Sequence, residues 1–175
     1  MKFLAIVILS VLAAVLYGVV HDQITIRICP EYFTVAHARL IQTRSLTLLA
    51  LFWGVFATWW VGLPLGVLLG IAARAGRWPR FDPPVVGRHI AVLLLVLGLM
   101  AVVAGLVAYT AKLGSDFRCF AAGIAEKIDQ SMHDRFMAAW AMHVTSYFAG
   151  AAGGVVLAII ILLKRRRLPK SMSES

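Results

Sequence analysis

Residues 46–73 read LTLLALFWGVFATWWVGLPLGVLLGIAA and contain no Asp, Glu, Lys or Arg. An α-helix rises about 1.5 Å per residue, so about 20 apolar residues are enough to cross the hydrocarbon core of a bilayer, which is about 30 Å thick. This run is longer than that, and its apolar residues are continuous rather than confined to one helical face. The stretch therefore predicts a transmembrane helix, with length to spare for tilt.

Three other apolar runs lie at residues 3–20, 90–111 and 137–163. The first is near the lower limit for a span and follows a basic residue, Lys2, as in a signal peptide, but no small-residue cleavage site follows it, so we expect a retained helix. The whole chain is 61% apolar and 14% charged, whereas soluble domains are about 45–50% apolar and about 25% charged. The composition excludes a soluble or disordered protein and predicts an all-α membrane protein, a four-transmembrane-helix bundle.

The distribution of Lys and Arg predicts the orientation of this bundle. Most of the 17 basic residues lie at Lys2, in the inner loop 74–89 and in the basic tail 164–175, whereas most of the 8 acidic residues lie in segments 21–45 and 112–136. Because basic connections are retained in the cytoplasm, we expect both termini inside a bacterial inner membrane and the two acidic segments outside, where they form a small extracytoplasmic cap. We expect a single transmembrane bundle over residues 1–163 and a cytoplasmic tail over 164–175. The net charge of +9 then reflects topology, so the expected partner is the lipid bilayer and not nucleic acid.

Small residues spaced four apart mark faces on which helices can approach closely. Such positions occur on three of the four spans: Gly62, Gly66, Gly70, Ala101, Gly105, Gly150 and Gly154. These faces pack within the chain, in a homo-oligomer or against a larger membrane-protein partner, and the spacing alone leaves the three open. Pro64 interrupts one of them and predicts a kink in the second span, because proline removes a helical hydrogen bond.

Histidines and acidic residues gather in the two outer segments, in a chain otherwise poor in polar side chains. Seven of them are candidate metal ligands: His21, Asp22, Glu31, His37, Glu126, Asp129 and His133. If residues 126–140 form one helix, Glu126, Asp129 and His133 lie on a single stripe. The alternation of apolar and polar residues over 23–29 favours a short strand between Asp22 and Glu31. We expect the two segments to share a site, although each group is equally compatible with a solvated surface.

Imidazole and carboxylate ligands suit zinc, manganese or iron. A second group, Met132, His133, Met137, Met142 and His143, offers ligands for copper, but these side chains diverge on an ideal helix, so copper is less favoured. Bis-histidine haem is disfavoured because it needs two imidazoles at one depth inside the bundle.

The two cysteines, Cys29 and Cys119, fall in different outer segments. An extracytoplasmic compartment is oxidising, so we expect a Cys29–Cys119 disulfide that joins the two segments. The alternative is a pair of buried thiols.

The segment His21-Asp22-Gln23, with Cys29-Pro30-Glu31-Tyr32-Phe33-Thr34 and His37 after it, resembles a segment of small, uncharacterised bacterial membrane proteins that have several predicted helices. The resemblance covers residues 21–37 and implies no activity.

No Gly-rich phosphate loop, GxSxG elbow or HExxH motif occurs in the chain, so no motif assigns an enzyme class. The leading hypothesis is an extracytoplasmic divalent-metal site, used for metal-assisted hydrolysis or for sensing. The alternative is a non-catalytic membrane subunit or assembly factor that docks a larger partner through its glycine-rich faces.

Overall fold

A computed structural model describes residues 1–168, apart from the side chains of residues 118–120. The described residues are mostly helical and include no strand. Its elements are α1 (Lys2–Ile28), α2 (Pro30–Thr34), α3 (Leu46–Phe56), α4 (Trp59–Arg74), α5 (Pro83–Thr110), the 3₁₀ turn η1 (Leu113–Asp116), α6 (Phe117–Ala125), the 3₁₀ turn η2 (Gln130–Met132) and α7 (His133–Arg167). Four stretches are long and apolar enough to cross a membrane: α1, α3 with α4, α5, and η2 with α7. The prediction of an all-α chain with four such helices is confirmed.

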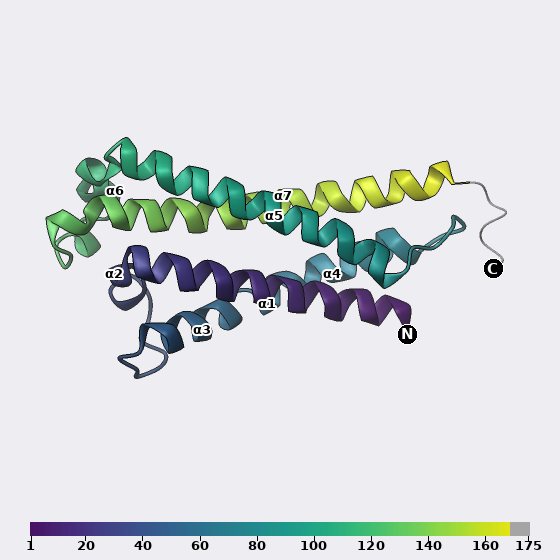
Figure 1. Cartoon of the computed structure of the whole chain (residues 1–175), viewed down its shortest axis with the longest axis horizontal. Helices are drawn as coiled ribbons and strands as arrows, with labels where there is room; N and C mark the ends of the chain where they lie inside the picture. The colour runs from purple at the N-terminus through teal and green to yellow at the C-terminus, as the bar shows by residue number, and fades with distance from the viewer. Residues whose placement is uncertain (169–175) are drawn as a thin grey trace.

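The four long stretches lie side by side in one elongated bundle (Figure 1). Helix α1 packs against α3, α4 and α5, and α7 packs against α5 and α4. The start of α1 and the end of α7 lie at one end of the bundle, here called the terminal end, and α2 and α6 lie at the opposite end, here called the far end (Figure 1). An even number of spans has this consequence, because the chain returns to the side from which it started.

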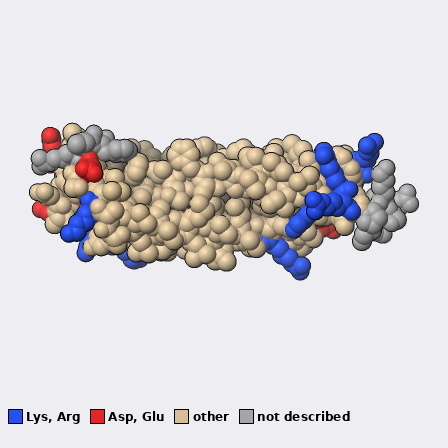
Figure 2. Space-filling model, turned by 90° about the horizontal axis from the view of Figure 1, so that it is seen from above, with Lys and Arg blue, Asp and Glu red and all other residues tan. Residues whose placement is uncertain are grey.

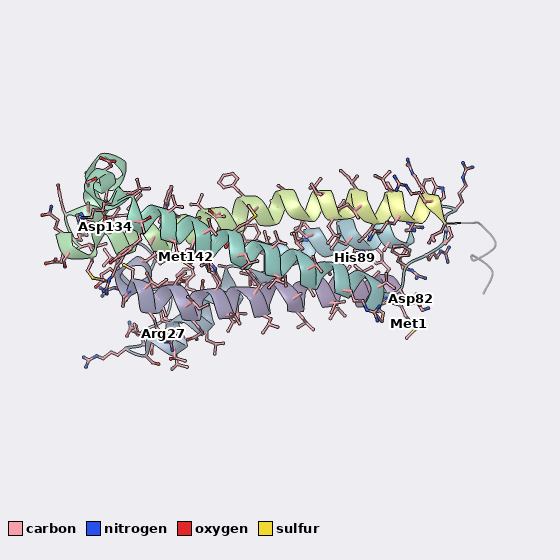
Figure 3. The ribbon with its side chains drawn as sticks, turned by 45° about the horizontal axis from the view of Figure 1, so that its top comes forward. Met1, Arg27, Asp82, His89, Asp134 and Met142 are labelled. Carbon is pink, nitrogen blue, oxygen red and sulfur yellow. The ribbon has the colours of Figure 1, made fainter. Side chains whose placement is uncertain are left out.

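On the face seen in Figure 2, charged side chains lie toward the two ends of the bundle and its middle carries none. At the terminal end Lys and Arg predominate, whereas the far end also carries Asp and Glu (Figure 2). Met1 and Asp82 mark the terminal end and Asp134 the far end (Figure 3). Large apolar side chains such as Leu12, Leu95 and Phe148 are exposed on the surface between them. This is the surface expected of a bundle surrounded by lipid, since a bilayer does not favour burial of these side chains in protein over exposure.

Residues 23–29 do not form the strand that their alternation predicted, and that prediction is wrong. Helix α1 continues through them to Ile28 and ends at Cys29, just before Pro30. Extending an existing helix costs far less than starting a new element, and a short alternating run does not separate the two periods. The burial of Thr25 and Ile26 beside exposed Ile24 fits a helical face and not a two-residue repeat.

The second span is interrupted at Ala57 and Thr58, between α3 and α4, and not at Pro64. The Thr58 hydroxyl donates to the carbonyl of Gly54 at 2.5 Å, a local bond that competes with the helical ladder. Helix α4 restarts at Trp59, so Pro64 lies in its second turn. The predicted kink is therefore displaced toward the start of the span.

The glycine faces mostly pack inside the chain. A Cβ atom at Gly62 or Gly66 would lie within about 3 Å of α1 atoms, at Gly70 it would meet the Phe3 ring, and at Gly154 it would meet Leu65 of α4. On α5, Gly105 makes room for Met142 of α7, and Ala101 is buried. The absence of side chains at these positions sets the spacing between helices, as small residues do in membrane bundles.

At the terminal end, a fully buried arginine holds the connection between α4 and α5. The guanidinium of Arg165 donates to four main-chain carbonyls, those of Ala72, Ala75 at 2.9 Å, Trp78 at 3.1 Å and Pro79 at 2.7 Å. These carbonyls lie at and beyond the C-terminus of α4, where helical carbonyls lack intrahelical partners and the helix dipole favours a cation. The end of α7 is thereby fixed to the end of α4.

A second connection joins the start of α1 to the same loop. Asp82 accepts from Lys2 at 2.9 Å and from Arg74 at 3.1 Å. These two cations, Lys2 first, hold the pKa of the Asp82 carboxyl below its usual value. Because Lys2 and Asp82 are each about half exposed, their ion pair orients the loop more than it stabilises the fold.

Candidate metal centre

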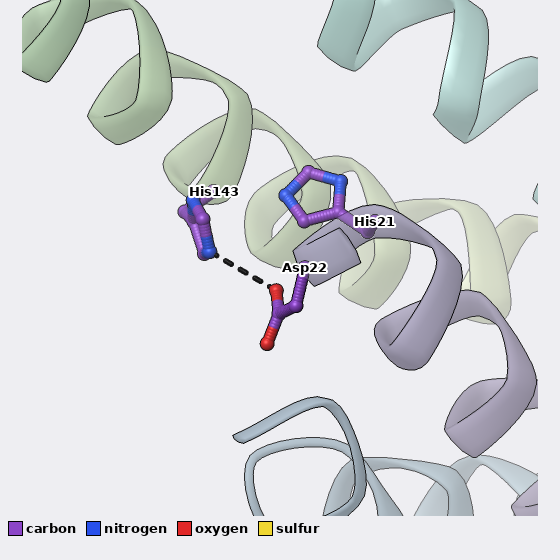
Figure 4. Close-up of side chains that lie close together, drawn as sticks. All are labelled: His21, Asp22 and His143. Carbon is purple, nitrogen blue, oxygen red and sulfur yellow. Dashed lines mark hydrogen bonds and ion pairs between the residues drawn. The ribbon is translucent and has the colours of Figure 1, made fainter. Parts of the chain in front are cut away.

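Two helices from opposite ends of the sequence bring three buried ionisable side chains together. His21 and Asp22 project from the last turns of α1, and His143 projects toward them from α7 (Figure 4). One ligand atom from each of the three lies within 4.8 Å of the others, and all three side chains are buried. His21 lies seven residues before the end of α1, which places the group about 10 Å inside the bundle from that end.

The hydrogen bonds of His143 orient its ring toward Asp22. Its Nδ1 lies 2.7 Å from the carbonyl oxygen of Ala139, which can only accept, so Nδ1 carries a hydrogen. Its Nε2 lies 3.2 Å from Oδ1 of Asp22. A ring fixed in this way presents Nε2 either to a proton shared with the carboxylate or to a metal ion. Metal-binding histidines commonly have this arrangement, with the other ring nitrogen bonded to a carbonyl.

His21 completes the group and carries an unsatisfied polar atom. Its Nε2 is buried and, among the described residues, has no hydrogen-bond partner. The ring contacts His143 edge-on, with centroids 4.6 Å apart, and stacks on Tyr17 at 5.6 Å. A buried nitrogen without a partner is costly, so native structures usually satisfy it with a ligand, an ion or water.

The donor set matches a first-row divalent metal. Ligand atoms about 2.0–2.2 Å from one ion, at roughly tetrahedral angles, lie about 3.3 Å from each other. The Asp22–His143 separation of 3.2 Å is already close to this value. The other separations are at most 4.8 Å, so those ligand atoms need to approach by no more than about 1.5 Å to bind one ion. Two neutral imidazoles and one anionic carboxylate form a donor set that zinc and iron(II) sites use, with coordination positions left open.

His37, one of the predicted ligands, lies in the shell around this group and not in it. Its Nδ1 donates to the carbonyl of Tyr32 at 2.8 Å, and the Tyr32 ring in turn lies 4.4 Å from the ring of His143. Trp53 of α3 contacts the His37 ring edge-on at 4.7 Å. Burial lowers the pKa of His37 and outweighs the bond to Tyr32, so the imidazole stays neutral.

Four of the predicted ligands have other partners or face solvent. Glu31 accepts from the Cys29 thiol at 3.4 Å, Glu126 is exposed, and the exposed Asp129 accepts from the backbone and hydroxyl of Ser131 at 2.8 and 2.6 Å. The Ser131 bonds, the hydroxyl first, lower the pKa of Asp129. His133 is buried, but its Nε2 donates to the carbonyls of Ala125 and Ile128, each at 3.2 Å. Of the seven predicted ligands, the structure therefore brings only His21 and Asp22 together.

The single stripe of Glu126, Asp129 and His133 requires a continuous helix that the chain does not form. Helix α6 ends at Ala125, η2 covers Gln130–Met132, and α7 begins at His133. His133 lies against Phe117 at 5.0 Å between ring centroids, where it connects α6 to α7. The interpretation of the stripe as a ligand face is corrected, because Glu126 and Asp129 lie in the connection between α6 and η2, whereas His133 begins α7.

Cys29 is buried and forms no disulfide with a described residue. Burial raises its pKa to about 12, so the sulfur is protonated and is not a thiolate ligand. The side chain of Cys119 lies outside the described residues, and the Cys29–Cys119 disulfide stays a prediction.

His143 is the residue that the predicted ligand set omitted. Its signal was present in the sequence, because it is an imidazole inside an otherwise apolar run, and an ionisable side chain in a span usually has a partner and a role. The partner, however, lies 121 residues away on α1. No local pattern reports which face of α7 meets α1, so the pairing needed the packed bundle.

Met142, part of the alternative copper group, packs into the space left by Gly105. It faces α5, and His143 on the next position of the same helix faces α1. The Met/His group is thus divided between two helix faces.

Comparison of the chain with known protein families, curated proteins and solved structures finds no match.

Proposed function

We propose that this chain is an integral membrane protein of the bacterial inner membrane that binds one divalent metal ion through His21, Asp22 and His143. The observation that carries the proposal is the convergence of three buried ligands, one of which, His21, has a nitrogen with no protein partner. Burying a carboxylate and two imidazoles together is unfavourable unless they are paired or bound to an ion. A metal ion satisfies all three groups at once.

The charge distribution supports the orientation of this site. The terminal end carries the basic loop and the basic end of α7, and cytoplasmic sides of membrane proteins have this excess. Both termini then lie in the cytoplasm, and the His21, Asp22 and His143 group lies near the extracytoplasmic surface. Metal ions would reach it from outside the cell membrane.

Zinc, iron(II) and manganese(II) are the favoured ions, because nitrogen and oxygen donors suit them and no described thiolate or thioether joins the group. Three protein ligands leave at least one coordination position open, as catalytic sites do. The bound ion would activate water for hydrolysis, or its occupancy would report metal concentration. Both functions begin with the same binding step.

The alternative function, a non-catalytic subunit that docks a larger partner through glycine faces, has less support. Gly62, Gly66, Gly70, Gly105 and Gly154 contact other helices of the same chain. A partner would therefore need another surface.

Metal content tests the proposal directly. Protein purified in detergent after exposure to Zn²⁺, Fe²⁺ or Mn²⁺, and then desalted, is expected to retain about one equivalent of one of these ions. The variants His143→Ala and Asp22→Asn each remove one ligand, so retention should fall to background. Cobalt(II) substitution adds a spectroscopic measurement, since its visible bands report nitrogen and oxygen ligation.

The matched control is His89→Ala, which removes an exposed imidazole at the terminal end. This variant should hold as much metal as the unmodified protein. Absence of metal from the unmodified protein with all three ions, or undiminished metal in His143→Ala, would refute the proposal.

A further inference from the structure

A cavity begins at the proposed metal site and continues into the bundle. It has a volume of about 110 Å³ and lies between α1, α4, α5 and α7, which supply most of its lining. On α1 its lining runs from Asp22 back to Ser10, a distance of about 18 Å along the helix. The cavity is therefore long and narrow, with His21, Asp22 and His143 at one end.

The lining has two zones of different chemistry. Most polar groups lie at the end near the proposed metal site, where Tyr17 and Ser146 share a hydrogen bond of 2.8 Å and Thr58 donates to a main-chain carbonyl. At the other end, the hydroxyl of Ser10 donates to the carbonyl of Ile6 at 2.8 Å. The remainder is lined mainly by leucines, among them Leu65, Leu69 and Leu94. In the polar zone, Nε2 of His21 is buried and has no hydrogen-bond partner among the described residues.

Water is a poor occupant of the leucine-lined zone. A single water needs about 10–15 Å³ and two to four polar partners, and large apolar cavities stay dry and accept apolar molecules instead. The volume of 110 Å³ exceeds the first requirement several times, but the leucines do not supply the second. The cavity therefore suits an apolar chain.

Gly150 keeps this space open. At glycines such as Gly54, Gly62 and Gly154, an added Cβ atom would collide with a neighbouring helix. At Gly150, the nearest neighbour of such an atom would be Leu97 Cδ1, at the ordinary distance of 3.8 Å. Close helix packing thus does not explain the missing side chain here. A larger residue at position 150, which lines the cavity, would occupy it.

From these observations we infer that the cavity binds a single-chain lipid whose head group carries an oxygen donor, with the chain among the leucines and the oxygen at the His21, Asp22 and His143 group. The position of the chain depends on the cavity alone, and the contact of the oxygen with a metal ion rests on the proposed function. Zinc, iron(II) and manganese(II) accept oxygen ligands in open positions. Without an ion, the imidazole of His21 is the remaining partner for the head group. A fatty acid and an isoprenoid-type quinone share this chemistry.

Equilibrium binding to the full chain in phosphatidylcholine nanodiscs tests the inference. The probes are radiolabelled palmitic acid and radiolabelled decylubiquinone, and protein-free discs measure their partition into lipid. We expect saturable binding of at least one probe, at about one molecule per chain, and which probe binds identifies the head group. Gly150→Leu, which adds bulk from α7, and Leu94→Trp, which adds bulk from α5, should each weaken that binding by about tenfold or more.

Ala151→Leu is the matched control, because it adds bulk at the next position of α7 on an exposed face. It should bind like the unmodified protein, and circular dichroism establishes that each variant is folded. Absence of saturable binding of both probes to metal-loaded protein, or undiminished binding to a folded Gly150→Leu or Leu94→Trp variant, overturns the inference.

The same experiment separates the inference from the proposed function. Protein that retains metal but binds neither probe would contradict the lipid site and leave the metal site supported. Protein that retains no metal but shows saturable binding lost in Gly150→Leu would contradict the metal site and support the lipid site with His21 as the head-group contact.

Discussion

Arg165 is the largest fully buried side chain among the described residues, and no described carboxylate neutralises it. Its positive charge is compensated by main-chain carbonyls at the end of α4, each of which would otherwise lack a partner. Hydrogen bonds to charged groups contribute more than neutral ones, and several converge here. This residue therefore has a larger structural role than the neighbouring basic residues.

Replacing Arg165 with Met should lower the free energy of unfolding by about 2–4 kcal/mol, because the carbonyls of Ala72, Ala75, Trp78 and Pro79 lose their donor. The change is measured by thermal unfolding in detergent, monitored through the circular dichroism signal of the helices. The control is Arg166→Met, which removes only a stacking contact over the Trp78 ring and should have a smaller effect. Equal losses in the two variants would contradict the structural role of Arg165.

The burial of His37 predicts that the stability of the folded protein depends on pH. Burial places its pKa below the ordinary value of 6.5, so the unfolded chain binds a proton more readily than the folded chain. The contribution of His37 is then complete above about pH 6.5 and declines as the pH falls below that value. The melting temperature of the unmodified protein should fall more between about pH 7.5 and pH 5.5 than that of His37→Gln.

Glutamine retains a donor for the Tyr32 carbonyl but does not titrate, so the comparison isolates protonation. His143 and Asp22 are close enough to contribute to the titration of His37, and they are present in both proteins. The same pH dependence in both proteins would show that His37 is not the group responsible.

The four long helices were predictable because every membrane-spanning helix must meet the same requirement for apolar length. A span must be apolar over about 20 residues, and charged or proline-containing sequence must separate it from the next. The short elements were not predictable in this way. Residues 23–29 and 126–132 are short and mixed in polarity, so whether each continues a helix depends on what α1 and α7 pack against.

The contact between α1 and α3 depends on two glycines that face each other. A Cβ atom at Gly54 would lie 2.6 Å from Cα of Val19, and one at Gly18 would lie 2.5 Å from the carbonyl oxygen of Gly54. Main-chain atoms cannot move aside as a flexible side chain can. Helix α1 must therefore shift if either position acquires a side chain, and His21 lies only three residues beyond Gly18.

Gly54→Ala should lower the free energy of unfolding by about 1–3 kcal/mol through this overpacking, and it should weaken metal retention as α1 moves. Gly150→Ala is the control, because its Cβ has ordinary contacts, and the better helix propensity of alanine should leave stability unchanged or raise it by up to about 1 kcal/mol. Thermal unfolding and metal content of both variants test the expectation. A neutral Gly54→Ala would show that α1 and α3 do not approach this closely.

At the scale of the whole molecule, the orientation can be measured by labelling. Arg39→Cys lies in the exposed connection between α2 and α3, and Arg80→Cys lies in the exposed loop between α4 and α5. A membrane-impermeant maleimide applied to spheroplasts should label Arg39→Cys and leave Arg80→Cys unlabelled until the membrane is permeabilised. The unmodified chain provides the background, and the reverse pattern would place the terminal end outside.

His21 and Asp22 belong to the first of the four long helices, and His143 belongs to the last. The ribosome must synthesise three long helices and the first turns of α7 before His143 exists, and that side chain must still insert beside a helix made much earlier. An ion held by all three side chains would consequently bind only after this part of α7 has been made. Chains that terminate before His143 would lack one of the three ligands.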